Sequence, residues 1–126
     1  MKSIKTLLLS ALIALPALQA AAQSEPSKVY FLESITSDNL IKAYKALGRE
    51  AKGKVAIKLS TGEAGNKYFL DPQLIAPLVK MVDGTIVECN TAYGGARATT
   101  DSHMKVAADH GFSAIADVDI MDAEGE

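Results

Sequence analysis

The sequence predicts an α/β fold: an open parallel sheet of about four strands with helices on its faces. Short apolar runs and amphipathic helical patterns alternate along the chain in the order β-α-β-α-β-α-β. The apolar runs are continuous, which is typical of strands that are covered on both faces. This order of elements implies parallel strands joined by right-handed crossovers, with the helices packed on the sheet.

Each predicted element has a local signal of its own. The strands are short runs of β-branched and other apolar side chains. The helices begin at a capping residue and end at a glycine or an aspartate–glycine pair. The predicted strands are Val29–Leu32, Val55–Ile57, Thr85–Val87 and Ala114–Ala116. The predicted helices begin at Ser37 or Asp38, at Pro72 behind the cap Asp71, and at Thr100 or Asp101, and they end at Gly48, Asp83–Gly84 and Gly111.

Residues 1–22 have the organisation of a secretory signal peptide. Lys2 and Lys5 precede an uncharged stretch rich in Leu and Ala at residues 6–18, and small residues then form a cleavage site. The apolar run is shorter than the roughly 20 residues that a bilayer requires. We therefore expect export to the periplasm or the exterior, with cleavage near Ala22 and no membrane attachment afterwards.

The remaining chain divides into a short polar leader, residues 23–27, and one α/β domain, residues 28–126. After the last predicted strand the chain runs from Asp117 to Glu126 without a helix to cover that strand. A parallel sheet exposed there would present apolar surface and an unpaired edge. We therefore expect the domain to be incomplete at its C-terminal end. The alternatives are a small domain with an acidic tail and one that pairs its open edge with a second copy.

Composition excludes some partners and some covalent links. Without Lys2 and Lys5 the formal net charge changes from −2 to −4, which argues against a nucleic-acid partner because such partners require a basic face. Cys89 is the one cysteine, so no intrachain disulfide can form. We expect the Cys89 thiol to be a buried apolar filler.

Candidate binding residues follow from the predicted topology. In an open parallel sheet, ligands bind beyond the carboxyl ends of the strands. This rule selects the loops at residues 58–67, 88–97 and 117–122, of which the first two are rich in Gly, Ser, Thr and Asn. We expect an unidentified small ligand there. The candidate ligand-binding residues are Lys58, Ser60, Thr61, Glu88, Asn90, Arg97, His103 and Asp117.

Several of these residues also have a purely structural interpretation. Glu88, at the end of a buried strand, requires a partner, which is either a ligand or Lys58 in an ion pair. The loop at residues 58–67 lacks the spacing of a P-loop, so it is either an anion-binding loop or an ordinary connection. Asp117 and Asp119 either hold a hard cation or act as acid and base, or they form a solvated acidic turn.

The two histidines lie on one predicted helix. His103 and His110 are seven residues apart, about 10.5 Å along the axis, so they cannot share a metal ion. His103 is in the first turn, at the same edge of the sheet as the loops, where its imidazole can reach a ligand. His110 is in the last turn, at the far edge, where it complements the helix dipole. The sequence therefore predicts no metal site.

Four stretches of the domain resemble the DUF362 family, a bacterial and archaeal group defined as a domain of unknown function. They are residues 55–63, 84–95, 103–111 and 115–117. The shared features include the lysine that ends the second predicted strand and the Asn-containing turn after the third. Many longer members of the family carry ferredoxin-type cysteine motifs for 4Fe-4S clusters. The resemblance implies such a cofactor only in those members, because a chain with Cys89 alone holds no cluster by itself.

Three functional hypotheses remain open at this point. The first is an exported DUF362-like protein of undetermined activity that forms the N-terminal part of an iron–sulfur-associated redox protein. The second is a non-catalytic periplasmic binding module for a small anionic ligand or a divalent cation. The third is a truncated fragment without independent activity.

Overall fold

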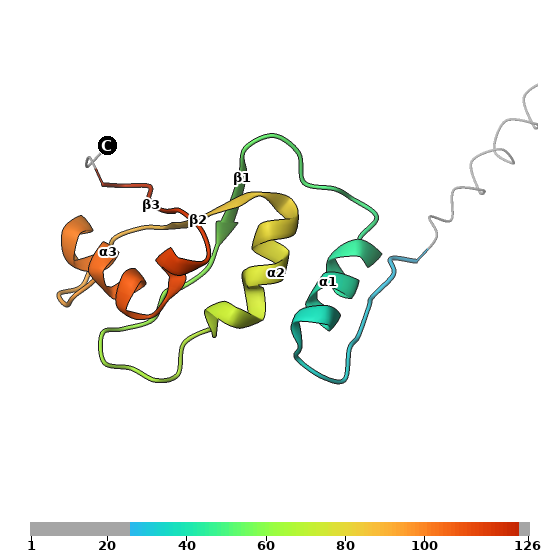
Figure 1. Ribbon diagram of the computed structural model, residues 1–126, viewed down its shortest axis with the longest axis horizontal. Coiled ribbons are helices and arrows are strands. Elements are labelled where there is room, and N and C mark those ends of the chain that lie inside the picture. Colours follow the sequence, from blue (N-terminus) through green and yellow to red (C-terminus); the bar gives the residue numbers. More distant parts are fainter. Residues whose placement is uncertain (1–25, 124–126) are drawn as a thin grey trace, which may run out of the picture.

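The computed structural model describes residues 26–123, so the predicted signal peptide lies outside the described part of the chain. The α/β class is confirmed (Figure 1). Among the described helices, none is long and apolar enough to span a membrane. The elements in chain order are α1 (Ser37–Ala46), β1 (Val55–Lys58), α2 (Pro72–Val82), β2 (Gly84–Glu88), α3 (Thr100–Asp109), the 3-10 helix η3 (Phe112–Ala114) and β3 (Val118–Ile120).

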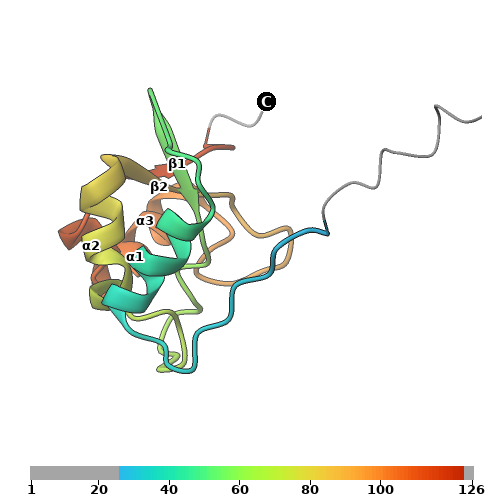
Figure 2. The ribbon, with the colours of Figure 1, turned by 90° about the vertical axis from the view of Figure 1, so that its right-hand side faces the viewer.

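The three strands form one parallel sheet in the order β1-β2-β3. Ile57 of β1 lies beside Ile86 of β2, and Ile86 in turn lies beside Val118 of β3. These three side chains therefore point to the same face of the sheet. Side chains of α2 and α3 pack in one cluster with Ile86, so both helices cover that face. Figure 2 shows α1 and α2 on the same side of β1.

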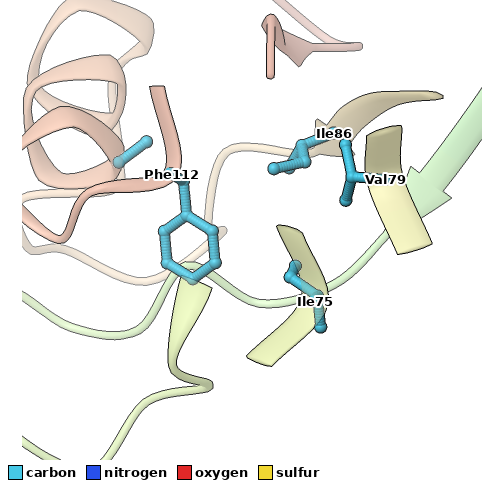
Figure 3. Packing of buried hydrophobic residues seen from close by; sticks show 5 residues of the cluster. Ile75, Val79, Ile86 and Phe112 are labelled. Carbon is cyan, nitrogen blue, oxygen red and sulfur yellow. The ribbon is translucent and has the colours of Figure 1, made fainter. Parts of the chain in front are cut away.

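A small apolar core lies between the helices and this face of the sheet. Ile86 and Phe112 are fully buried, and α2 adds Ile75 and Val79. Figure 3 shows the Phe112 ring and the other three side chains gathered around one space. Ala107 is also fully buried, and its small side chain lets α3 approach the core closely. This packing holds the carboxyl ends of the strands in fixed positions.

Helix α2 begins and ends as the sequence predicts. The Asp71 side chain accepts a hydrogen bond from the Gln73 backbone N–H at 2.8 Å, and Pro72 occupies the first helical position. The helix ends at Asp83, whose φ of 50° lies in the left-handed region, and Gly84 begins β2 directly afterwards. Because no loop separates α2 from β2, the helix determines where the central strand starts.

Helix α1 packs on α2, at the margin of the domain. The Thr36 side chain accepts a hydrogen bond from the Asn39 N–H at 3.2 Å, which caps the helix where the sequence predicts its start. The Ser37 hydroxyl donates to the Leu74 carbonyl at 2.9 Å. This bond joins the start of α1 to the start of α2, so the two helices begin at the same end of the domain.

The predicted first strand, Val29–Leu32, is wrong. The segment is extended but belongs to no strand of the described structure, and Val29 and Phe31 are 90% and 84% exposed. An apolar run becomes a strand only where a neighbour accepts its backbone hydrogen bonds. Figure 1 shows this segment leaving α1 on the side away from α2, far from β1. Within residues 26–123 the sheet therefore has three strands.

The predicted last strand is displaced along the chain. The run Ala114–Ala116 is expected as a strand, but Ala114 ends η3 and β3 begins at Val118. Gly111, with φ of 90°, turns the chain so that Phe112 enters the core. The Ile115 N–H then bonds to the Phe112 carbonyl at 3.1 Å. Local hydrogen bonds thus hold the apolar run in a turn, and the strand forms after it.

Candidate functional site

Four polar or charged residues are buried in the described part of the chain, and all four meet at the carboxyl ends of the strands. They are Thr61, Glu88, Arg97 and His103, and none is more than 7% exposed. They come from the loop after β1, the end of β2, the loop after β2 and the first turn of α3. All four belong to the candidate set predicted from the sequence. Together with Glu63, which bonds to Arg97, they are called the rim cluster below.

Glu88 is the centre of the rim cluster. Its Oε1 accepts hydrogen bonds from the Thr61 backbone N–H, from the Thr61 hydroxyl at 3.0 Å and from Arg97 Nη1 at 3.3 Å. Lys58 Nζ lies 4.0 Å from Glu88 Oε2, and the Lys58 side chain is 58% exposed. The predicted ion pair with Lys58 is thus at the outer limit of distance, and Arg97 is the main cationic partner.

Arg97 uses all five of its N–H groups within this region. Its Nε donates to Glu63 Oε1 at 3.1 Å, and its Nη2 donates to the same oxygen. The other Nη2 proton goes to the Tyr93 hydroxyl at 3.0 Å. The two Nη1 protons go to Ser60 Oγ and to Glu88, each at 3.3 Å. A guanidinium has five N–H donors, so Arg97 has no donor left for a ligand and instead ties the two loops to the end of β2.

The contacts among Glu63, Tyr93 and Arg97 shift three pKa values. Hydrogen bonds from Arg97 and Tyr93 lower the pKa of the Glu63 carboxyl. In return, the Glu63 carboxylate raises the pKa of the Tyr93 phenol, and burial adds to this rise. The same carboxylate raises the pKa of the Arg97 guanidinium, against the opposing effect of burial. At neutral pH the group therefore consists of a carboxylate, a neutral phenol and a guanidinium.

His103 lies behind Glu88 and has no exposed surface. Its Nε2 is 3.2 Å from Thr61 Oγ1, and its Nδ1 is 3.4 Å from Asn90 Oδ1. Because the Thr61 hydroxyl donates its proton to Glu88, it accepts from His103 Nε2–H. Asn90 is oriented in turn by Thr100, whose hydroxyl accepts from Asn90 Nδ2 at 3.0 Å. In this arrangement the imidazole contacts the buried side of the rim cluster and does not reach the surface.

His110 does not lie at the far edge of the sheet, as the sequence suggested. Its Nδ1 donates to the Thr61 carbonyl at 2.6 Å, and its ring stacks on Phe69 with the centroids 3.9 Å apart. Thr61 therefore contacts both His103 and His110, two helical turns apart, so α3 lies along the loop after β1. Helical spacing places residues around an axis but does not orient that axis, which is why the sequence could not reveal this contact.

Asp117 is the predicted site residue that the fold separates from the rim cluster. Because β3 begins at Val118, Asp117 precedes the strand and is exposed at the amino end of the sheet. Asp122 takes the expected place: its Oδ1 accepts a hydrogen bond from the Asn90 backbone N–H at 2.8 Å. The apolar–acidic–apolar alternation of Val118–Ile120 is the signal that locates this strand correctly.

Glu63 and Tyr93 are functional candidates that the sequence prediction omits. The Tyr93 hydroxyl donates to Glu63 Oε1 at 2.6 Å, so each of the two long loops supplies one member of the pair. Both side chains are partly exposed, unlike that of Arg97 behind them. The available signal was a carboxylate in one glycine-rich loop and an arginine in the other, at the same end of neighbouring strands.

Two hollows on the surface of the described residues lie away from the rim cluster. One is lined by the end of α1, residues 48–52 and the end of α2, including Tyr44, Lys45 and Met81. Another lies at the amino end of the sheet, beside Asp117. The order β1-β2-β3 also has no reversal that would mark a binding crevice. The candidate site therefore rests on buried, mutually bonded polar groups and not on the shape of a hollow.

Cys89 is exposed, so the expectation of a buried filler is wrong. Glu88 points into the rim cluster, so the next residue along the chain points to the other face, which α2 and α3 do not cover. Within residues 26–123, no three His, Cys, Asp or Glu side chains form a group that could hold a metal ion. A 4Fe-4S cluster is held by four thiolates, so the single thiol of this chain does not fit one.

Comparison with known proteins identifies the domain. A family model described as "Domain of unknown function (DUF362)" matches residues 55–126. This region contains all three strands, α2, α3 and the whole rim cluster. No curated protein and no solved structure matches the chain. Because the family model covers more than half of the sequence, the chain belongs to the DUF362 family.

Proposed function

We propose that this DUF362 domain is an exported binding domain for a small polar ligand that carries no net charge. The ligand lies at the carboxyl ends of the strands, against the loops that Arg97 ties together. The observation that carries the proposal is the saturation of Arg97: all five of its donors are used by protein groups.

The position of the buried charges supports a binding role. Burying Glu88 and Arg97 requires desolvation that an ion pair only partly repays, so buried charge is costly to maintain. In this domain the buried pair lies at the carboxyl end of the sheet, beside the two long loops after β1 and β2. The cluster holds the loop after β1 and the loop after β2 in one arrangement, and preorganised loops lose less entropy when a ligand binds.

The groups that face solvent indicate the class of ligand. Lys58 offers an ammonium that bonds only to the Leu59 carbonyl among the described residues, at 3.0 Å. The three hydrogen bonds to Glu63 described above all use Oε1, which leaves Oε2 for a ligand donor. Tyr93 is 58% exposed, and its ring adds apolar surface next to Glu63. A ligand with both donors and acceptors satisfies this set.

Electrostatics favours an uncharged ligand over an anion or a cation. Two cationic side chains, Lys58 and Arg97, stand beside two carboxylates, Glu63 and Glu88. A phosphate would meet two carboxylates and find no free donor on Arg97, whereas a divalent cation would meet two cationic side chains. A sugar or a zwitterionic amino acid avoids both conflicts. Export is supported by the charged, apolar and small-residue regions of residues 1–22 in that order.

The binding proposal is tested by amide NMR titration of the isotope-labelled mature chain. The probes are glucose, glycine, inorganic phosphate and magnesium chloride. We expect glucose or glycine to shift the Gly62, Gly94 and Gly95 amides, and phosphate and magnesium to leave them unchanged. The variant Lys58→Gln should weaken that response, whereas Lys105→Gln, a change at another exposed lysine, on α3, should not. Saturable shifts with phosphate or magnesium would overturn the proposed ligand class. The absence of shifts with all four probes would overturn it as well.

The export part is tested separately. The full chain is expressed in a Gram-negative host, and the N-terminus of the recovered protein is read by mass spectrometry. We expect a chain that begins at Gln23 in the periplasmic fraction. A chain that keeps Met1 and remains in the cytoplasm would contradict export while leaving the binding proposal intact.

A further inference from the structure

The segment before α1 exposes more large apolar side chains than any other part of the described chain. Val29, Tyr30, Phe31 and Leu32 are 90%, 52%, 84% and 38% exposed. The values alternate with a period of two, which is the periodicity of a β-strand. One face of the segment, formed by Val29 and Phe31, is almost bare. Soluble domains rarely present such an apolar surface unless it contacts a partner.

The segment makes few bonds to its own domain. Within residues 26–123, no hydrogen bond joins residues 28–33 to another described residue, and Ser34 is the first to be bonded, to the Asn39 amide at 3.0 Å. Its backbone donors and acceptors are therefore free to pair with a strand. Figure 1 shows the segment on the side of α1 that faces away from α2 and the sheet.

Strand β1 presents a matching unpaired edge. It is the outer strand of the order β1-β2-β3, and it has four residues, as has the apolar run Val29–Leu32. Ile57 points to the core face, whereas Ala56 and Lys58 are exposed on the other face. An edge of this kind is a template for an added strand from another chain.

We propose that Val29–Leu32 of one copy pairs with the β1 edge of a second copy, and that the exchange is reciprocal. The occupant of each edge is thus the same segment of the partner, and the dimer has twofold symmetry. The added strand would extend the sheet and cover the apolar side chains of the segment. The proposal is independent of any ligand at the rim cluster.

Several observations favour a second copy over the segment's own domain. The start of α1 is held on α2 by the bond from Ser37 to the Leu74 carbonyl, and Leu40 packs against the core. From this anchored start the segment runs along the outer side of α1, so α1 lies between it and β1 (Figure 1). A segment that its own β1 edge does not hold is available to the same edge of a second copy, and strand exchange between protomers is a common route to a dimer.

The test measures the mass of the full mature chain by light scattering over a dilution series, together with hydrogen exchange of residues 55–58. We expect twice the chain mass and protected β1 amides. The variant Phe31→Asp should be monomeric and should lose that protection, because a charge on the bare face cannot be buried without a partner. Phe31 is 84% exposed in the monomer, so the substitution should leave the domain folded.

Tyr68→Asp is the matched control, because Tyr68 is 94% exposed on a distant loop and should not alter the dimer. A second measurement identifies the strands in contact. With Val29 and Phe31 on the core face of the joined sheet, Tyr30 shares the other face with Ala56. In a Cys89→Ser background, Tyr30→Cys protein mixed with Ala56→Cys protein should therefore give dimers with a short bismaleimide. A monomeric wild-type chain overturns the proposal, as does a Phe31→Asp variant that remains dimeric. A monomer whose β1 protection depends on Phe31 also overturns it, since the segment then pairs within its own chain.

Discussion

The two ends of the sheet differ in whether their charged side chains are buried or exposed to solvent. At the carboxyl ends of the strands, Glu88 and Arg97 are buried and bonded to each other, to Thr61 and to the loops. At the amino ends, Asp83 and Asp117 stand in solvent beside a hollow. The charged groups at the amino end are thus stabilised by water, whereas those at the carboxyl end are stabilised by hydrogen bonds and ion pairs within the protein.

This difference shows what holds the long loops after β1 and β2. Leu59 and Phe69 of the loop after β1 pack against the apolar core, but the glycine-rich and polar residues of the two loops add little apolar surface to it. The rim cluster holds these residues in place, because Arg97 bonds to groups from three segments of the chain at once. Substitutions at the carboxyl end should therefore cost much more stability than matched substitutions at the amino end.

The largest contrast between the two ends of the sheet should come from Glu88→Gln. The change removes the carboxylate that faces Arg97 in the interior, and we expect the free energy of unfolding to fall by about 3 kcal/mol, the lower end for a broken buried pair because Glu63 still neutralises the guanidinium. The matched change at the amino end, Asp117→Asn, should stay within about 0.5 kcal/mol. Denaturant unfolding of both variants measures the contrast, and equal losses would show that the two ends do not differ.

The next effect concerns the loop after β1. Gly62 has φ of 83°, and a Cβ added there would lie 2.6 Å from Phe69 Cβ. Gly65 has a similar φ of 76° but meets nothing within 4 Å. Both alanine variants incur the left-handed backbone cost of about 1–2 kcal/mol. Gly62→Ala should lose roughly 1–3 kcal/mol more from overpacking, because Phe69 must move.

Thermal unfolding of the two variants separates the contact from the backbone cost. Gly62→Ala should also disturb the stacking of Phe69 on His110, which NMR of the His110 ring reports. Equal melting temperatures for Gly62→Ala and Gly65→Ala would show that the loop is not packed against α3 as described.

The parts of the fold that could be predicted depend on local signals. The Asp71–Pro72 start and the Asp83–Gly84 end of α2 are set by capping and by backbone conformation within a few residues, and both are confirmed. Val29–Leu32 and Ala114–Ala116 have the composition of strands as well. Whether such a run pairs depends on distant neighbours, and neither run is a strand in the described structure.

The site could be predicted as far as topology alone places residues. Parallel strands bring their carboxyl ends together, and this rule places Thr61, Glu88 and Arg97 in one region. It fails for Asp117, because a shift of one strand boundary moves a residue to the opposite end of the sheet. It also fails for His110, because the direction of α3 across the loop is set by packing and not by helical spacing.

A smaller effect should come from Thr61→Val. The substitution keeps the shape of the side chain but removes the hydroxyl that links Glu88 to His103. We expect a loss of about 1–2 kcal/mol, since two buried polar groups each lose a partner while the Thr61 backbone N–H still bonds to Glu88. Thr85→Val, in the amino half of β2, should change stability by less than about 0.5 kcal/mol. A double-mutant cycle with Glu88→Gln measures the coupling, and additive losses would mean that the hydroxyl acts alone.

The smallest effect is the pH dependence of the bond between Glu63 and Arg97. Arg97 and Tyr93 hold the pKa of the Glu63 carboxyl below its ordinary value of 4.5. A carboxyl whose pKa is lowered by folding adds stability that is fully present above its unfolded pKa and is lost as the pH falls through the folded value. The melting temperature of the wild type should therefore exceed that of Glu63→Gln at pH 7 by a small margin, and the margin should close in acid below pH 4.5.

The exposure of this carboxyl keeps the margin small, because water and salt screen a pair at the surface. Tyr93→Phe provides the internal control, because it removes one of the two hydrogen bonds that lower the Glu63 pKa. The difference in melting temperature between Tyr93→Phe and the double variant Tyr93→Phe/Glu63→Gln should therefore be smaller than the wild-type margin, and it should close at a higher pH. A margin that stays constant from pH 7 into acid would mean that the Glu63 charge does not stabilise the carboxyl end. The contrast between the two ends of the sheet would then rest on Glu88 and Thr61, which lie below the surface.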